Sequence, residues 1–248
     1  MSQIKIVTET GSTNDDVLEL ARLGAEHGTA VLALSQRHGR GRLGKSWHSP
    51  VGSGLYGSVL LCPRLLERRS YPRLTLLAGV AVAVAIEAET GIPLRLKWPN
   101  DLYLGDKKCG GILVETLLTG ARDCLVAGIG LNLSQMSGSV PEEVEKRAGA
   151  LWPVKHQKRH DPISLFAAIH RQLLALTDTC EREGFTQIFA KWRQRDGFHG
   201  RRLAWAGPGG DRIIGESAGI DDEGNLLLLD DERHLHQINC GDVQPAIT

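Results

Sequence analysis

The sequence lacks the features that mark several large classes of protein. Aromatic residues make up only 5% of the 248 residues, and the formal net charge is zero because 29 Lys and Arg balance 29 Asp and Glu. A chain without an overall basic field is poorly suited to binding nucleic acid, so we expect neither DNA nor RNA as a partner. The longest apolar stretch, 74–86, contains Thr75 and Gly79 and is shorter than the ~18 residues of a membrane-spanning helix. We therefore expect no membrane association.

The cysteines are few, scattered and odd in number. They are Cys62, Cys109, Cys124, Cys180 and Cys240, with no C-x-x-C pair among them. This usage favours free thiols in a reducing compartment and excludes a disulfide framework or a zinc knuckle. The first residues also lack a basic segment followed by an apolar one, so no secretory signal is visible. Together these absences predict a cytoplasmic protein.

The hydrophobic pattern predicts a mixed α/β (α+β) fold. Strands are expected at 3–9, 29–35, 55–61, 94–98, 109–117 and 125–133, and helices after Ser12 or Thr13 and at 74–89, 162–184 and 185–195. Several strands follow one another across short turns, which predicts a mixed sheet flanked by helices. The segment 134–149 has little periodicity and is expected to be a mobile connection.

The character of the sequence changes after Gly197. Short strand patterns at 201–205, 212–220, 226–229 and 235–238 are separated by turns rich in Gly, Pro and Asp. Short strands at this spacing predict a small β-barrel. We therefore divide the chain into an α/β domain, 1–197, and a barrel, 198–248.

The most informative segment is a loop rich in glycine and arginine at 36–48. No Asp or Glu occurs from His27 to Leu66, whereas the five cations Arg37, Arg40, Arg42, Lys45 and Arg64 lie inside that interval. The glycines at 39, 41 and 44 let backbone N–H groups approach a ligand closely. A solvated basic loop is the plainer interpretation, but the interleaved glycines and the missing acids favour a local positive well that binds an anion.

The same loop matches the phosphate-loop pattern G-x-x-x-x-G-K-[ST] from Gly39 to Ser46. A phosphate loop must open a helix, because the N-terminus of that helix supplies much of the anion site. Here Ser46 is followed by Trp-His-Ser-Pro-Val-Gly, which does not propagate a helix. We therefore reject this interpretation.

Two further segments indicate a function only when they are considered together with the other motifs. Lys97-Trp-Pro-Asn-Asp101 is by itself typical of a turn, and Lys108-Cys-Gly-Gly-Ile-Leu-Val-Glu115 is by itself typical of an edge strand. With Thr10-Gly-Ser-Thr-Asn14, the glycine–arginine loop and Gly128-Ile-Gly-Leu-Asn132, they form five separated motifs in one order. In that order and spacing the chain resembles the biotin protein ligases over about residues 8–133.

This resemblance implies a catalytic α/β domain followed by an SH3-like C-terminal barrel. It implies that biotin and MgATP are the substrates and that biotinyl-5′-AMP is a bound intermediate. The biotin then passes to a lysine of a biotin carboxyl carrier domain of a carboxylase. Because the motifs begin at Thr10, we expect a monofunctional ligase without the N-terminal DNA-binding domain that some members carry.

The resemblance also implies roles for individual residues. The expected catalytic residues are Lys108, Arg42 and Asp101, with Asp101 also the magnesium ligand. The expected biotin contacts are Ser12, Thr13, Asn14, Gln36, Gly39, Arg40, Gly41, Arg42, Lys108, Gly110 and Gly111. The expected nucleotide contacts are Arg40, Asn100 and Asn132. Cations suit this chemistry, because joining a carboxylate to an α-phosphate brings two anions together.

Some alternatives stay open at this point. A lipoate-type acyl-adenylating ligase would use the same scaffold, and a non-catalytic biotin sensor would bind without turnover. The tail reads Gly241-Asp-Val-Gln-Pro-Ala246, without the arginine that the family often has there, so an ATP contact from the barrel is in doubt. A homodimer is possible, since some members pair through sheet edges.

Overall fold

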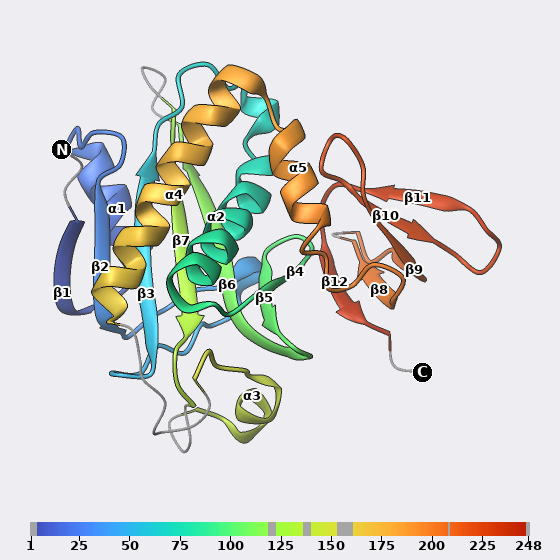
Figure 1. Cartoon of the computed structure of the whole chain (residues 1–248), viewed down its shortest axis with the longest axis horizontal. Helices are drawn as coiled ribbons and strands as arrows, with labels where there is room; N and C mark the ends of the chain where they lie inside the picture. Colours follow the sequence, from blue (N-terminus) through green and yellow to red (C-terminus); the bar gives the residue numbers. More distant parts are fainter. Residues whose placement is uncertain (1–3, 119–122, 136–139, 153–160, 208, 247–248) are drawn as a thin grey trace.

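A computed structural model of the chain shows a large sheet and a small sheet placed end to end (Figure 1). The structure describes residues 4–118, 123–135, 140–152, 161–207 and 209–246. The large sheet has the order β1-β2-β3-β7-β6-β5-β4. Its strands are β1 (Ile4–Thr10), β2 (Ala30–Gln36), β3 (Gly54–Leu61), β4 (Arg95–Lys97), β5 (Asp101–Leu104), β6 (Lys107–Leu117) and β7 (Cys124–Asn132). Only β1 and β2 pair in parallel and the other neighbours are antiparallel, which confirms the predicted mixed sheet.

Helices cover both faces of the large sheet because its central strands are apolar on both sides. On one face lie α2 (Arg73–Thr90) and α4 (Pro162–Glu183), with α5 (Thr186–Arg193) packed against them (Figure 1). On the other face, α1 (Thr13–Arg22) packs on β2, β3 and β7. Neighbouring residues such as Val59 and Leu60 belong to separate hydrophobic clusters, as the alternation of side chains along a strand requires.

Local sequence signals explain where two of the helices end or begin. Gly91 ends α2 in the left-handed conformation, with φ +73°, and its N–H donates to the Glu87 carbonyl. The Asp161 side chain caps α4 by accepting from the Ser164 N–H at 3.0 Å. Ser12 stands at the N-cap of α1, but its side chain makes no capping hydrogen bond. One helix was not predicted: the short α3 (Glu142–Arg147) lies inside the segment expected to be a loop.

The small sheet contains the last five strands of the chain, all antiparallel, in the order β11-β10-β9-β8-β12. They are β8 (Arg202–Ala206), β9 (Arg212–Ile220), β10 (Leu226–Leu229), β11 (Leu235–Ile238) and β12 (Asp242–Pro245). This arrangement confirms a small β unit after the mixed sheet, whereas the exact boundary at residue 197 stays a prediction. The indole of Trp98 donates to the Gly224 carbonyl at 3.1 Å and ties the two units together.

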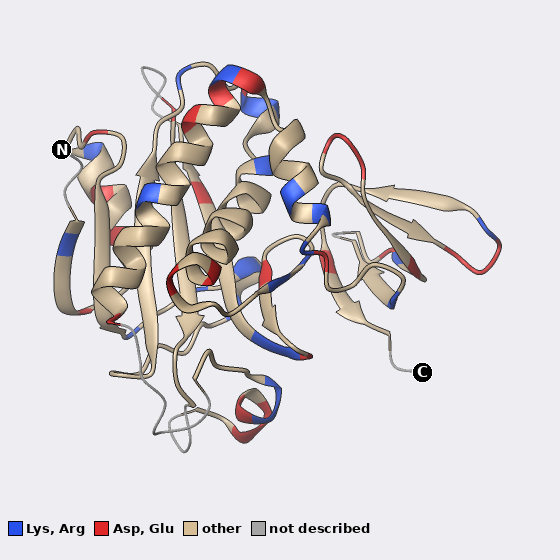
Figure 2. Cartoon of the chain, in the orientation of Figure 1, with Lys and Arg blue, Asp and Glu red and all other residues tan. Residues whose placement is uncertain are grey.

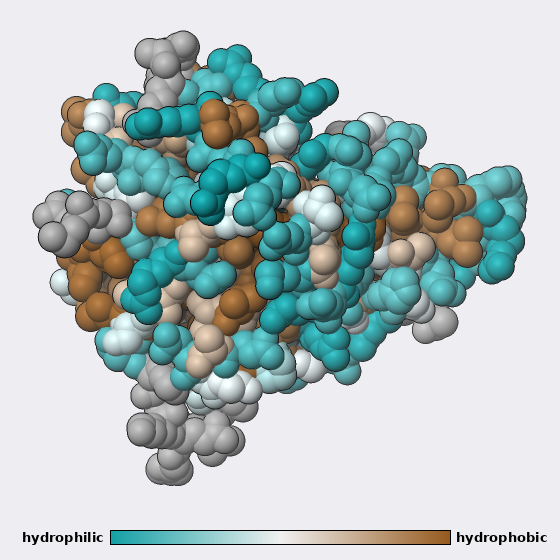
Figure 3. Space-filling view, turned by 45° about the horizontal axis from the view of Figure 1, so that its top comes forward, coloured by the Kyte–Doolittle hydropathy of each residue, from teal (hydrophilic) through white to brown (hydrophobic). Residues whose placement is uncertain are grey.

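The exterior agrees with the balanced composition. Figure 2 shows Lys and Arg interspersed with Asp and Glu along both units. Figure 3 shows a face that is largely hydrophilic, with apolar residues in small groups. No helix among the described residues is long and apolar enough to cross a membrane.

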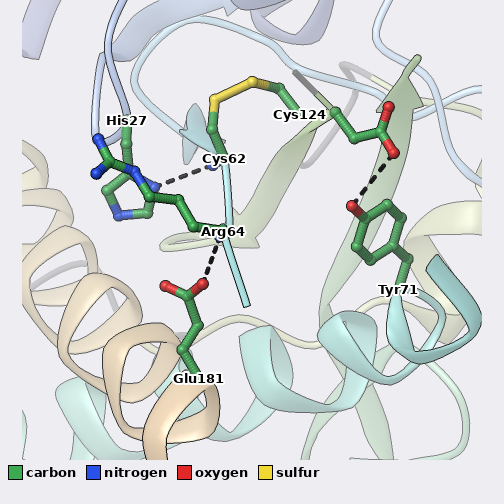
Figure 4. The surroundings of a disulfide bond; sticks show 7 residues. His27, Cys62, Arg64, Tyr71, Cys124 and Glu181 are labelled. Atoms are coloured by element: carbon green, nitrogen blue, oxygen red, sulfur yellow. Dashed lines mark hydrogen bonds between the residues drawn. A yellow bond between two sulfur atoms is a disulfide. The ribbon is translucent and has the colours of Figure 1, made fainter. Parts of the chain in front are cut away.

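The prediction of five free thiols is wrong for two of them. Cys62 and Cys124 form a disulfide with a Cα–Cα distance of 4.2 Å (Figure 4). Leu61 pairs with Leu125 across β3 and β7, so the two cysteines are the next pair of that ladder. Only the strand register brings together residues 62 positions apart, and spacing in the sequence gives no sign of it. The prediction of a reducing, cytoplasmic location therefore no longer has support from the cysteines.

The other cysteines match the prediction. Cys109, Cys180 and Cys240 are free, and the first two are buried. Burial raises the pKa of the Cys109 thiol to about 12, and that of Cys180 likewise. A thiol held in its protonated form is a poor nucleophile, so Cys109 contributes packing beside Lys108.

Candidate active site

A cavity of about 1080 Å³ opens at the edge of the large sheet, next to the small one. Its wall comes from the N-terminus of α1, the glycine–arginine loop, the turn between β4 and β5, strands β6 and β7, and α3. Most of the predicted site residues line it: Ser12, Thr13, Asn14, Gln36, Arg40, Gly41, Arg42, Asn100, Asp101, Lys108, Gly111 and Asn132. Segments far apart in the sequence therefore converge on one volume, as the resemblance implies.

Two predicted glycines do not line the cavity. A Cβ at Gly110 would clash with Leu131 and Leu102 on the core side, whereas its neighbour Gly111 faces the cavity. A Cβ at Gly39 would clash with the carbonyl of Trp47, and the Trp47 N–H donates to the Gly39 carbonyl at 2.8 Å. Gly39 thus lets the loop fold back on itself, and Gly110 lets β6 pack tightly.

The loop closes on itself as a tight turn, with a single 3-10 turn at Arg42–Gly44, and opens no α-helix. The Gly41 N–H donates to the Lys45 carbonyl at 2.7 Å, and the Lys45 N–H donates to the Arg42 carbonyl at 3.2 Å. Leu43 and Gly44 both have positive φ, +55° and +72°. The chain after Ser46 continues without a helix through residue 53. The rejection of the phosphate-loop interpretation is therefore confirmed.

The predicted positive well needs correction. Carboxylates from other parts of the chain pair with the cations of the loop. Arg37 pairs with Glu9 at 3.6 Å, Arg40 with Asp15 at 2.6 Å and Glu115 at 3.2 Å, and Lys45 with Asp242 at 2.7 Å. Residues 27–66 contain no Asp or Glu, but in the folded protein carboxylates from α1, β1, β6 and β12 lie beside the loop and neutralise most of its charge.

Arg42 differs from these cations. Its guanidinium donates to Asn100 Oδ1 and to the Gly241 carbonyl, both at 3.3 Å, and no ion pair to a carboxylate forms among the described residues. Burial lowers the pKa of Arg42, although Asp242 and Asp101 act in the opposite direction. A half-buried guanidinium with neutral hydrogen-bond partners keeps its charge available to an incoming anion.

Asp101 lies between two lysines at the start of β5. Lys108 Nζ is 2.5 Å from Oδ1 and Lys97 Nζ is 2.9 Å from Oδ2. Burial acts to raise the pKa of Asp101, but the two ammonium groups outweigh it, so the pKa lies below its usual value. Lys97 was not among the predicted site residues, although it opens the Lys-Trp-Pro-Asn-Asp motif. Its side chain is only 6% exposed, so this charge depends on Asp101 for compensation.

A second cluster of polar side chains reaches the cavity wall through Thr13, Asn14 and Gln36. The Thr13 N–H donates to Gln36 Oε1 at 2.9 Å, and Thr13 Oγ1 lies 2.7 Å from Ser58 Oγ. Ser58 donates to Asn14 Oδ1 at 2.6 Å, and Asn14 Nδ2 donates to Glu115 Oε2 at 2.6 Å. Neither Ser58 nor Glu115 was predicted as a site residue. Glu115 ends a quoted motif and could have been found, whereas nothing in the sequence distinguishes Ser58.

Two polar atoms of the cavity wall lack a partner among the described residues. They are Asn132 Oδ1 and Trp47 Nε1, both buried. Asn132 is held by its amide, which donates to the Gly149 carbonyl at 3.0 Å, so its oxygen is left for a ligand. The Trp47 ring lies against Gly130, where a Cβ would clash with it, and 5.8 Å from Lys108 Nζ. Unpaired buried polar atoms are uncommon and mark places where a ligand completes the hydrogen bonding.

The site does not offer a ready-made metal centre. Among the described residues no three His, Cys, Asp or Glu side chains are grouped so as to hold an ion. Both oxygens of Asp101, the predicted magnesium ligand, are occupied by ammonium groups. These residues do not fit a resident metal ion.

Comparison with known proteins agrees with this site. Residues 7–132 match the profile of the biotin/lipoate A/B protein ligase family. The chain belongs to this family. Among the relatives of this ligase-family chain is the bifunctional ligase/repressor BirA of Bacillus spizizenii, 35% identical over 94% of this chain and 71% of its own length. Another is the biotin–[acetyl-CoA-carboxylase] ligase of Mycobacterium tuberculosis, which is 33% identical over 91% of this chain and 83% of its own length.

The solved structures similar to this ligase-family member include the biotin protein ligase of Aquifex aeolicus in complex with biotin and ATP. It is 31% identical, with a TM-score of 0.85, over 99% of this chain and all of that one. The likeness therefore extends through the small C-terminal sheet, beyond the residues that the family profile matches.

Proposed function

We propose that the protein is an ATP-dependent biotin protein ligase. It joins biotin to ATP as biotinyl-5′-AMP and transfers the biotin to a lysine of a biotin carboxyl carrier domain. The observation that carries the proposal is Arg42, a half-buried cation that lines the same cavity as Asp101 and Lys108 and forms no ion pair with a carboxylate among the described residues. The relatives named as biotin ligases and the structure with biotin and ATP support the same assignment.

The reaction brings the biotin carboxylate to the α-phosphate of ATP and releases pyrophosphate. Arg42 neutralises the two anions as they approach, and Lys108 turns from Asp101 to follow the phosphate oxygen as its geometry changes. The loop lies over the product and excludes water from the anhydride. In the transfer step the carrier lysine attacks the activated carbonyl and AMP leaves. Asp101 orients the incoming amine.

The remaining predicted residues divide between the two substrates. Ser12, Thr13 and Gln36 lie where hydroxyl and amide groups suit the ureido ring, which presents both donors and an acceptor. We assign Asn100 and Asn132 to the nucleotide: both line the cavity, and Asn132 Oδ1 is an acceptor without a partner among the described residues. Arg40 can contact a phosphate of ATP only after its ion pairs with Asp15 and Glu115 have broken.

Magnesium enters in this proposal as part of the substrate MgATP. That ion commonly binds through substrate phosphates with one or two carboxylates. Asp101 would contact it only after Lys108 has turned away. We also propose that the chain divides at residue 197, that the protein is cytoplasmic, that it has no DNA partner and that it forms a homodimer.

Calorimetric titration tests the proposal and separates it from a lipoate-type ligase. Biotin should bind the free protein, and lipoate should neither bind at comparable concentration nor displace biotin. Addition of MgATP should then convert the bound biotin to its adenylate, which mass spectrometry detects after denaturation. Tighter binding of lipoate would favour the other ligase, and binding without adenylate would favour a biotin sensor.

A further inference from the structure

The guanidinium of Arg40 is shared between two carboxylates. Asp15 accepts from Nη1 at 2.6 Å and from Nη2 at 2.7 Å, in the bidentate geometry that makes an arginine–carboxylate pair strong. Glu115 accepts only from Nη2, at 3.2 Å and 3.4 Å. Two negative charges therefore face one positive charge, so this group presents a net negative charge to an approaching polyphosphate.

The two carboxylates differ in their other contacts. Glu115 also accepts from Asn14 Nδ2 at 2.6 Å, which is shorter than either of its contacts with Arg40. Among the described residues, the Asp15 carboxylate has no hydrogen bond except those from Arg40. Arg40 lines the cavity, whereas Asp15 lies outside its lining. Asp15 therefore holds a cation of the site without itself being placed to touch a substrate.

Only the side chain of Arg40 has to move for the guanidinium to leave Asp15. The backbone of Arg40 pairs with Ser46 in a β-bridge. The next residue is also fixed, because the Gly41 N–H donates to the Lys45 carbonyl at 2.7 Å. The side chains of Arg40 and Asp15 are 36% and 56% exposed, so water can replace either partner when the ion pair breaks.

We propose that Asp15 is a positioning residue that competes with the phosphates of ATP for Arg40. The inference rests on the proposed function and deepens it by naming an intramolecular anion that lowers the affinity for the nucleotide. When the triphosphate binds, the Arg40 guanidinium rotates from Asp15 to a phosphate, and the Asp15 carboxylate is left in water. The measured affinity for ATP is then the difference between the phosphate contact and the ion pair that it replaces.

The test compares Asp15→Asn with Asp16→Asn by calorimetry at saturating biotin. The titrant is MgATP with a methylene bridge between the α- and β-phosphates, which the ligase cannot cleave. Asp15→Asn should lower the Kd roughly threefold, the factor expected when an exposed ion pair no longer competes. Asp16 is the matched control, because it shares the first turn of α1 but accepts from Thr10 Oγ1 and forms no ion pair among the described residues. Its variant loses the same charge at the same helix end and should keep the Kd of the unaltered protein.

A second measurement distinguishes competition from a change in the fold of the site. In the steady-state release of pyrophosphate, Asp15→Asn should lower the KM for MgATP by the same factor and leave kcat unchanged. The reason is that Asp15 no longer holds Arg40 in either the nucleotide complex or the transition state. The ratio of the two KM values should approach one as sodium chloride is added, because salt screens the exposed pair in the unaltered protein.

The outcomes are separable. A Kd for the ATP analogue that is unchanged or raised in Asp15→Asn would overturn the inference, since Asp15 would then either not compete for Arg40 or help to place it. An equal decrease in Asp16→Asn would also overturn it, because the effect would come from the charge of the helix end. Failure of the unaltered protein to bind biotin and MgATP would instead overturn the proposed function.

Discussion

Asp101 shows how a single residue can join stability to the chemistry of the site. Its carboxylate compensates Lys97, which is buried, and also holds Lys108, whose side chain is 37% exposed and free to turn into the cavity. The ion pairs of Asp101 with Lys97 and with Lys108 therefore have different roles. Lys97 holds the carboxylate ionised and in place, and Lys108 supplies a mobile charge.

Replacement of this carboxylate should give a pH-dependent loss of stability. The folded-state pKa of Asp101 lies below the unfolded value near 3.9, so its ionised form stabilises the fold above that value. The contribution disappears as the pH falls through the folded-state pKa. Asp101→Asn should lower the free energy of unfolding by about 2 kcal/mol at about pH 7, discounted for the exposure of Lys108.

Urea unfolding from about pH 7 to about pH 3 measures this difference. The deficit of Asp101→Asn should shrink toward the acid end. Asp106→Asn is the control, because Asp106 forms an exposed pair with Arg201 and should show a small deficit throughout. A deficit for Asp101→Asn that is independent of pH would show that the carboxylate has no depressed pKa.

At the scale of elements, strong periodicity decides what the sequence can predict. Helices α2 and α4 and strands β3 and β7 are long and apolar, and their predicted bounds agree with the structure within a few residues. The missed elements are β5, β12 and α3, which have four to six residues each. Segments this short do not complete enough periods to be distinguished from turns, and neighbouring strands or contacts decide their conformation.

The disulfide is an element-scale feature with a direct chemical test. Cys62 and Cys124 join the ends of β3 and β7 and close a loop of 62 residues. In the unfolded, unreduced chain three of the five cysteines should react with iodoacetamide, and all five should react after reduction. Labelling of all five without reduction would contradict the disulfide.

The same bond should stabilise the fold. Reduction should lower the free energy of unfolding by about 4 kcal/mol, because it relaxes a constraint on the unfolded chain. Guanidinium unfolding with and without reductant measures the change. The double variant Cys62→Ser with Cys124→Ser should be insensitive to reductant, which controls for effects at the remaining cysteines.

At the scale of the whole molecule, the small C-terminal sheet contacts the loop that covers the cavity. Lys45 pairs with Asp242, and Arg42 donates to the Gly241 carbonyl, across almost 200 residues of sequence. The five local motifs predicted twelve of the residues that line the cavity, but they did not predict these partners. They depend on how two units pack, and no local pattern encodes that packing.

Asp242→Ala should loosen the loop without unfolding the protein. An exposed pair contributes at most about 1 kcal/mol, so the melting temperature should hardly change. Trypsin should cleave the ligand-free variant within the loop several times faster than the unaltered protein, because local opening exposes its Arg and Lys residues. Asp231→Ala removes a pair with Arg202 inside the small sheet and serves as the control. Equal cleavage of all three proteins would show that the contact does not restrain the loop.

Release of pyrophosphate is the measurement that tests the central claim most directly. The unaltered protein should release pyrophosphate when biotin and MgATP are both present, and neither substrate alone should suffice. Lys108→Ala should retain its fold but, at saturating biotin and MgATP, release pyrophosphate at least roughly 100-fold more slowly, since an electrostatic contact to the reacting oxygens is lost. No release by the unaltered protein, or an undiminished rate in Lys108→Ala, would contradict the account.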